Sequence, residues 1–336
     1  MNLDALKTEP RLLMEASLKP VQGTRFQPTG FPHLGAAVYT LANNQQMLAV
    51  ESAQSMANHM ETACWDEANR KPIAALDGMP YVESTLPDGS STNSLLEAHR
   101  LNSPYIVNSK EFAAIEKEIG FEKNKPFDRQ KLAKALFKYD PNSLVHGVFL
   151  EKVGGVVRLP RSLSAFIEAS NVTVAPSGGV KLDRVQPGTS EEKVTPYGKA
   201  EDGYGNVPFP RDEYTGDIKA YFNLDLALIM GFDLPADAKE FIIELALLKI
   251  RRFLRFGLRL RTACDLELTQ LSIKRPTKWD LPELEAIETR IGELVQINTK
   301  ADRFAKPFKT DVVYDAKLAK AKKKQQEKEP AEAAQP

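Results

Sequence analysis

The sequence predicts an α+β fold in which one antiparallel sheet carries helices on a single side. Two stretches alternate apolar and polar residues as half-buried strands do, residues 11–19 and 218–230. Residues 236–256 show the apolar periodicity of a long helix, and a further strand-like run follows at 258–268. The composition, 42% hydrophobic and 27% charged over 336 residues, is that of an ordinary globular chain.

The elements are expected in a definite order along the chain. The strand at 11–19 is followed by a loop rich in glycine and proline and then by a helix near residues 45–65. Two strand-like runs come next, at residues 144–153 and 156–174, and the strand at 218–230, the helix at 236–256 and the strand at 258–268 complete the set. Strand, helix, strands, helix, strand is the order of a ferredoxin-like sheet, the plan of RNA-recognition motifs.

Two insertions interrupt this order. Residues 66–142 hold a loop rich in Gly, Ser and Pro at 77–94 and helical segments near 109–119 and 128–138. Residues 171–216 begin as a hairpin whose expected turn is Ser177-Gly178-Gly179, and they continue as a long polar loop. A hairpin that leads into such a loop is expected to project from the core.

The first sixty residues have the physical features of an anion-binding segment. A strand end, a donor-rich loop and a helix start combine free N–H groups with the helix dipole, to which amide and guanidinium side chains add donors. The segment lacks GxxxxGK[ST] and GxGxxG, so no nucleotide cofactor is predicted. The expected donors are Lys19, Gln22, Arg25, Gln27, Ser52, Gln54 and Ser55.

A second basic cluster lies between residues 249 and 261. Arg251, Arg252 and Arg255 are interpreted as a solvated helix flank. Arg259 and Arg261 lie on a predicted strand, where arginine is unusual unless it meets carboxylates or phosphate. In the ferredoxin-like order these two could converge with three further arginines on a groove that follows a phosphate backbone. Those three are Arg100, Arg158 and Arg161.

The composition excludes several other classes of protein. Lys plus Arg equals 45 and Asp plus Glu equals 45, which argues against a protein that coats nucleic acid without a local groove. Cys64 and Cys264 are too few for a disulfide framework or a zinc site, so we expect reduced thiols, a cytoplasmic location and no metal. No apolar run is long enough to cross a membrane, and no cofactor is predicted.

Several motifs resemble one known family. LKPVQGTRFQPTGFPHLGAAVY and VESAQSMANHME, with HRLNSPYI, LVHGVFLEK, RLPRSLSAFIEASNV and FLRFGLRLRTACDLE further along, resemble the filament subunit of type I-G CRISPR effector complexes, formerly type I-U. This subunit is a member of the RAMP superfamily. The resemblance extends from about residue 11 to about residue 271.

The resemblance implies a non-catalytic subunit that binds CRISPR RNA and polymerises along it, so that the guide can pair with target DNA. The implied partners are crRNA, other copies of the chain, and the large and guide-end-binding subunits of Cascade. Asn58 joins the RNA-binding candidates, and Val174, Ser177, Gly178, Gly179 and Lys181 belong to the implied thumb.

The same resemblance divides the chain into a ferredoxin-like palm, helical fingers and a β-hairpin thumb. The palm takes residues 11–65, 143–170 and 218–271; the fingers take 66–142; the thumb takes 171–217; a helical extension takes 272–315; and a disordered tail takes 316–336.

Two alternatives remain open at this point. One is a RAMP-type endoribonuclease that processes CRISPR RNA with His33 or His59 as a proton-transfer group. The other is a self-assembling structural protein that binds no nucleic acid.

Overall fold

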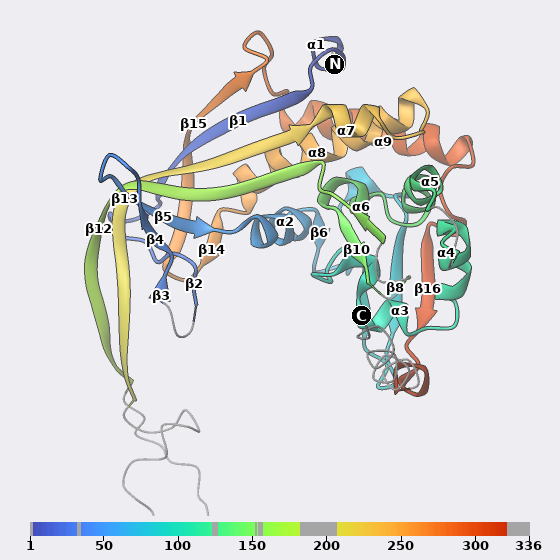
Figure 1. Cartoon of the computed structure of the whole chain (residues 1–336), viewed down its shortest axis with the longest axis horizontal. Coiled ribbons are helices and arrows are strands. Elements are labelled where there is room, and N and C mark those ends of the chain that lie inside the picture. The colour runs from blue at the N-terminus through green and yellow to red at the C-terminus, as the bar shows by residue number, and fades with distance from the viewer. Residues whose placement is uncertain are drawn as a thin grey trace, which may run out of the picture.

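The computed structural model describes residues 3–31, 35–122, 127–151, 153, 157–181 and 207–320. Its centre is a seven-stranded sheet in the order β14-β15-β1-β13-β12-β5-β4, with every neighbouring pair antiparallel (Figure 1). Its strands are β1 (Arg11–Pro20), β4 (Val38–Thr40), β5 (Gln46–Glu51), β12 (Leu163–Lys181), β13 (Val207–Asp225), β14 (Arg259–Arg261) and β15 (Cys264–Arg275).

One face of this sheet forms the core. Residues alternate along β1, so that Leu12, Met14, Ala16 and Leu18 are buried as the sequence predicts. Helices α2 (Ala53–Thr62) and α8 (Ala236–Phe256) cover this face, with the Phe253 ring of α8 6.3 Å from the Phe222 ring of β13. The bounds of α8 match the predicted helix at both ends.

The opposite face of the sheet carries polar and aromatic side chains. Phe166 stacks on Tyr221 with ring centroids 5.0 Å apart, and Lys219 pairs with Glu15 at 3.0 Å. Phe166 is 38% exposed, so this aromatic pair lies at the surface.

Several boundaries differ from the sequence-based expectation. The predicted helix at 45–65 starts only at Ala53, because β5 pairs with β12 and Ser52 then caps the helix. The strand at 218–230 ends at Asp225, whose carboxylate accepts the Leu228 N–H at 2.8 Å and starts α7 (Leu226–Met230). The run at 144–153 is not one strand, since α6 (Asn142–His146) precedes β10 (Val148–Leu150).

The predicted turn at Ser177–Gly179 is wrong. Strand β12 continues without a break to Lys181 and pairs with β13, so that Gly178 lies opposite Pro210. The alternation that identifies a strand is weak in the Pro-rich segment that begins β13, which hid the partner strand. Figure 1 shows the far parts of β12 and β13 as a two-stranded ribbon that leaves the body of the molecule.

The insertion after α2 forms a second, smaller layer. The predicted loop at 77–94 contains strands β8 (Tyr81–Thr85) and β9 (Ser91–Asn93), and residues from the carboxyl-terminal segment complete the sheet as β16 (Lys309–Val313), parallel to β8. Helices α4 (Phe112–Ile119) and α5 (Arg129–Tyr139) agree with the two predicted helical segments.

The remaining elements are short, apart from one helix. Helix α9 (Leu284–Lys300) packs on α8, and Arg251 of α8 donates to the Leu281 and Pro282 carbonyls just before it. The flank of α8 that was predicted to be solvated therefore holds the segment before α9 in place.

The remaining short elements are α1 (Asp4–Lys7), β2 (Gly30–Phe31), β3 (Gly35–Ala36), β6 (Trp65–Asp66), β7 (Lys71–Pro72), η1 (Ala74–Leu76), η2 (Arg100–Asn102), α3 (Pro104–Val107) and β11 (Val157–Leu159).

Glu244 of α8 is a buried carboxyl group whose oxygens have no hydrogen-bond partner in the described part of the chain. Burial, with a smaller contribution from Glu240, raises the pKa of Glu244 to about 7. Its folded-state pKa thus lies above the unfolded value of 4.5. The protonated carboxyl stabilises the fold fully below about pH 4.5, and this contribution is lost as the pH rises through about 7.

Glu244→Gln should therefore be less sensitive to alkaline pH than the natural protein. We expect the loss of unfolding free energy between pH 5.5 and pH 8 to shrink by about 2 kcal/mol. Urea titrations at the two pH values measure it. Glu285→Gln, at a position where the carboxylate side chain is 72% exposed, is the control and should leave the difference unchanged.

Candidate nucleic-acid interface

The loop between β1 and β2 is fastened to three neighbouring segments. The Gln27 N–H donates to the Ala263 carbonyl at 2.7 Å, the Thr29 N–H donates to Val50 at 3.0 Å, and Phe26 pairs with Tyr214 at the base of the ribbon. These backbone donors, which the sequence suggested as free ligand groups, are bonded within the protein. The groups left at the surface of this loop are exposed side chains, chiefly Gln22 and Arg25.

Arg261 and Arg259 have different surroundings although they are two residues apart. The Arg261 guanidinium pairs with Glu51, a carboxylate only 3% exposed, and donates to the Gln27 carbonyl at 2.8 Å. Arg261 therefore meets the carboxylate that the sequence allowed as one alternative to phosphate. Arg259 is exposed and has no ion-pair partner among the described residues.

Lys19 and Arg25 each have an acidic neighbour but stay largely in solvent. Lys19 lies 3.0 Å from Glu267 with 60% of its side chain exposed, and Arg25 lies 3.2 Å from Glu213 with 56% exposed. The Lys19–Glu267 pair is exposed on both sides and contributes little to stability, so Lys19 can exchange its partner for a ligand anion. The Glu213 carboxylate beside Arg25 is only 13% exposed.

The amino-terminal end of α2 connects this loop to a cleft. The Ser52 hydroxyl accepts the Ser55 N–H at 3.3 Å and caps the helix. Gln54 accepts from Arg161 at 2.5 Å and donates to Asn58 at 3.1 Å. Gln54 of α2 thus bonds to Arg161, which lies 107 positions further along the chain.

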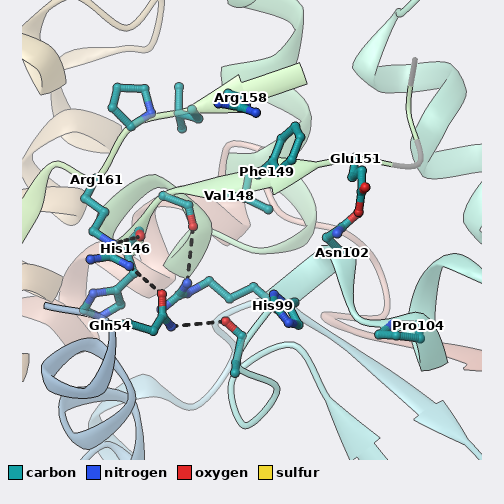
Figure 2. Close-up of a pocket in the computed structure, with 15 residues that line it drawn as sticks. Gln54, His99, Asn102, Pro104, His146, Val148, Phe149, Glu151, Arg158 and Arg161 are labelled. Atoms are coloured by element: carbon teal, nitrogen blue, oxygen red, sulfur yellow. Dashed lines mark hydrogen bonds between the residues drawn. The ribbon is translucent and has the colours of Figure 1, made fainter. Parts of the chain in front are cut away.

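The cleft has a volume of about 670 Å³ and lies between η2, the end of α6, β10 and β11. Figure 2 shows Arg161, His146 and Gln54 at one end and Phe149, Arg158, Glu151 and Asn102 at the other. The Arg158 guanidinium carbon lies 4.1 Å from the centroid of the Phe149 ring, a cation–π contact. The cleft therefore brings together four predicted residues, Gln54, Arg100, Arg158 and Arg161.

Arg100 differs from the other cations of the cleft, because it is only 4% exposed. Its guanidinium forms two hydrogen bonds with Glu61, 2.7 Å and 3.0 Å long, and Asn142 donates to the same carboxylate. This buried ion pair therefore fixes the position of the residues at the bottom of the cleft.

Further titratable groups are buried within electrostatic reach of Arg100. Burial raises the pKa of Asp140 to about 7 and lowers the pKa of Lys249. Burial, followed by the charge of Lys249, lowers the pKa of His146 well below its usual value, so His146 is neutral at physiological pH.

The remaining predicted residues are dispersed. Val174 and Gly179 are exposed on the ribbon, Ser177 lies within its paired strands, and the Lys181 side chain and His33 fall outside the described residues. His59 packs near Phe253, and burial lowers its pKa. The described segments hold no cluster of three or more potential metal ligands.

The site residues predicted from the sequence do not include Phe149, His99 or Asn102, which also line the cleft. One signal was available for Phe149: Val148 and Leu150 are buried on either side of it, so its ring must point to the opposite side of β10, where it is 36% exposed. His99 and Asn102 follow no period that would identify them.

Exposed arginines, amide donors and a cation–aromatic pair are typical of proteins that bind a phosphate backbone. Residues 12–174, just under half of the chain, match the family described as CRISPR-associated protein GSU0053. This match confirms the resemblance to CRISPR-associated proteins that the sequence motifs indicate. No helix within the described ranges combines the length and apolar content needed to cross a membrane.

Solved structures show weaker likenesses. A chain described as "CRISPR RNA-guided surveillance complex, pre-nicking" is 13% identical over 87% of this chain and 88% of that one, with a TM-score of 0.40. A second, "CRISPR RNA-guided surveillance complex", is 12% identical over 87% and 84% with a TM-score of 0.36. Csc2 of Thermofilum pendens is 12% identical over 96% and 83% with a TM-score of 0.31. These likenesses are too low to assign a function. A search of the curated proteins finds no match.

Arg100→Ala should strongly destabilise the protein, because it leaves the Glu61 carboxylate buried without its cation. We expect a loss of about 3–5 kcal/mol of unfolding free energy, measured by urea denaturation. Arg158→Ala, which removes an exposed arginine from the same cleft, should change it by less than about 0.5 kcal/mol. Equal effects of the two substitutions would show that the Glu61 pair does not hold the cleft.

Proposed function

We propose that the protein is a non-catalytic backbone subunit of a type I CRISPR effector complex, which binds guide RNA and supports its pairing with target DNA. The observation that carries this proposal is a set of donors on segments that bond to one another. Gln22 and Arg25 lie on the loop that bonds to Ala263 and Val50, and Gln54 of α2 bonds to Arg161 in the cleft that Arg158 also lines. The match of residues 12–174 to a CRISPR-associated family supports it independently.

The donors on this surface suit a ligand whose sequence varies. Arginine side chains and amides contact phosphate oxygens, which fix the register of a nucleic acid but carry no sequence information. Base pairing by the guide then reads the target, so the subunit itself needs no catalytic group. The endoribonuclease alternative is tested by incubating the isolated protein with repeat RNA.

The strand order supports a palm of the ferredoxin-like type. In chain order β1, α2, β12, β13, α8 and β15 form a strand–helix–strand–strand–helix–strand unit, and its sheet order is fourth, first, third, second. We assign the layer that contains α4, α5 and β8 to the fingers, and the β12–β13 ribbon to the thumb. The large and guide-end-binding subunits would join the ends of the resulting filament.

Arg25→Ala and Arg259→Ala should each weaken binding to single-stranded RNA by roughly fivefold, which corresponds to about 1 kcal/mol. Each loss of one phosphate contact should also lower the slope of log K against log salt by about 0.7. The effect should be the same for RNAs of different sequence. Filter binding at several salt concentrations measures both quantities.

Arg275→Ala is the matched control. Arg275 is 49% exposed and pairs with Glu9 at 2.8 Å, as Arg25 pairs with Glu213, but it lies at the far end of β15. We expect the slope of the natural protein in this variant. An unchanged slope in both Arg25→Ala and Arg259→Ala would refute the proposed surface, and failure of the natural protein to bind RNA would favour a structural protein instead.

Shortening the ribbon should separate folding from assembly. Replacing residues 177–211 with a short Gly-Ser linker keeps the Pro176–Asp212 pair and the bridge between Phe26 and Tyr214. The monomer should keep its circular dichroism spectrum, since linker changes alter closure entropy only slightly. Light scattering after size exclusion should show the loss of multi-copy complexes on RNA. Full-length complexes from the shortened chain would contradict the thumb assignment.

A further inference from the structure

The layer formed by the insertion after α2 borders a second pocket, separate from the cleft. This pocket has a volume of about 830 Å³ and lies between the end of α4, helix α5 and the turn that joins α7 to α8. Among the described residues, none lines both the pocket and the cleft. Figure 1 shows α4 and α5 at the end of the molecule opposite the β12–β13 ribbon. We call this second pocket the α4–α5 pocket.

The α4–α5 pocket has an apolar lining that is held by the core. Phe137 is only 2% exposed, and its ring centroid lies 5.9 Å from that of Phe241 and 5.2 Å from that of Phe304. Phe121 and Leu234 also line the pocket and pack against the core, but both are only partly buried. Part of this apolar lining therefore remains in water, and a ligand that covers it gains free energy from its burial.

Two lysines of the pocket are held by weak ion pairs. Lys134 lies 2.6 Å from Asp233, and the two side chains are 57% and 51% exposed. Lys138 lies 2.8 Å from Glu118, with exposed fractions of 39% and 40%. Ion pairs that are exposed on both sides contribute little to stability, so both lysines can exchange their partner for a carboxylate of a ligand.

Two further lysines of the pocket, Lys117 and Lys131, are exposed and have no ion-pair partner in the described part of the chain. Packing holds Lys131 beside the pocket. Gly120 ends α4 with a φ of +73°, and a Cβ atom at this position would lie 2.9 Å from Lys131 Cδ. The stem of Lys131 therefore lies against the end of α4, where a glycine leaves room for it.

The lining favours a ligand that is both apolar and anionic. A large apolar side chain would cover Phe121 and Leu234, and carboxylates beside it would pair with the lysines. A nucleic acid fits less well, because Glu118, Glu122 and Asp233 also line the pocket and repel a continuous row of phosphates. A protein segment can place its carboxylates on either side of an apolar residue and so avoid these acidic groups.

We propose that the α4–α5 pocket binds a short acidic segment of a partner protein. One large apolar side chain of this segment lies against Phe121 and Leu234, and its carboxylates pair with Lys117 and Lys131. The inference goes beyond the proposed function, since it concerns a protein partner and requires no RNA.

A library of random short peptides displayed on phage is the probe. Selection on the full-length protein, without RNA, should enrich peptides in which Asp or Glu flanks Phe, Leu, Met or Trp. A selected peptide labelled with fluorescein then gives a dissociation constant by fluorescence anisotropy. If no such peptides are enriched, the inference is wrong.

Lys131→Glu should weaken binding of the selected peptide about tenfold, because a carboxylate then faces the carboxylates of the peptide. High salt should weaken binding to the natural protein, and this dependence should be smaller in the variant. Lys110→Glu is the matched control, since Lys110 is an exposed lysine that precedes the other end of α4 and does not line the pocket. It should bind the peptide as the natural protein does.

Leu234→Ala tests the apolar contact. It should weaken peptide binding several-fold and leave the salt dependence unchanged, because no charge is removed. Leu228→Ala in α7 is its control, since Leu228 is also partly buried against the core but does not line the pocket. Circular dichroism and the unfolding temperature confirm that each variant is folded.

The other possible occupants give different results. Binding of RNA in the pocket would make single-stranded RNA displace the peptide and would make Lys131→Glu weaken RNA binding. A second copy in the pocket would show as self-association that Lys131→Glu abolishes, measured by light scattering. Either result overturns the inference, as does a Lys131→Glu variant that binds the peptide normally or a Leu234→Ala variant that behaves as Leu228→Ala does. Failure of the natural protein to bind RNA refutes only the proposed function, because the peptide is bound without RNA.

Discussion

Helix α2 is held at both ends by buried carboxylates, and the rest of the candidate site depends on this constraint. Glu51 precedes the helix and pairs with Arg261 of β14, while Glu61 lies near its end and pairs with Arg100 of η2. A buried carboxylate without its cation is strongly destabilising, so the helix cannot shift without breaking one pair. The loop after β1 and the cleft beside η2 therefore keep a fixed position relative to α2.

This constraint divides the arginines into two groups. Arg100 and Arg261 are used inside the protein, and Arg251 holds the segment before α9 through backbone carbonyls. Arg158 and Arg259 stay exposed and available to a ligand. A chain with equal numbers of acidic and basic residues can still have a local basic groove, because binding depends on where the charges lie.

The ribbon of β12 and β13 begins where the helices stop covering the sheet. Helices cover one face of the sheet only where β12 and β13 lie beside β1 and β5, and a register shift between Ser170 and Thr173 marks the end of that region. Beyond it, in the described part of the chain, the backbones of the two strands pair with each other, and Tyr214 forms a bridge to Phe26. A two-stranded ribbon of this kind has little apolar burial of its own, so it contributes little to the stability of the fold.

The sequence by itself determined the elements whose apolar residues repeat with a strong period. Strand β1, helix α8, and the alternation of Ile218 to Leu224 were predictable because burial on one face imposes that repeat. The sequence also identified most of the surface donors, because arginine and glutamine at loops and helix starts are informative wherever they occur.

Tertiary structure alone decided which of these donors are free to bind a ligand. Whether Arg261 meets phosphate or Glu51, and whether Arg100 meets RNA or Glu61, depends on carboxylates 210 and 39 positions away. The pairing of Gly178 with Pro210, and the meeting of Gln54 with Arg161, are likewise contacts between distant segments. Local periodicity carries no information about such contacts, because they form only once the sheet has brought those segments together.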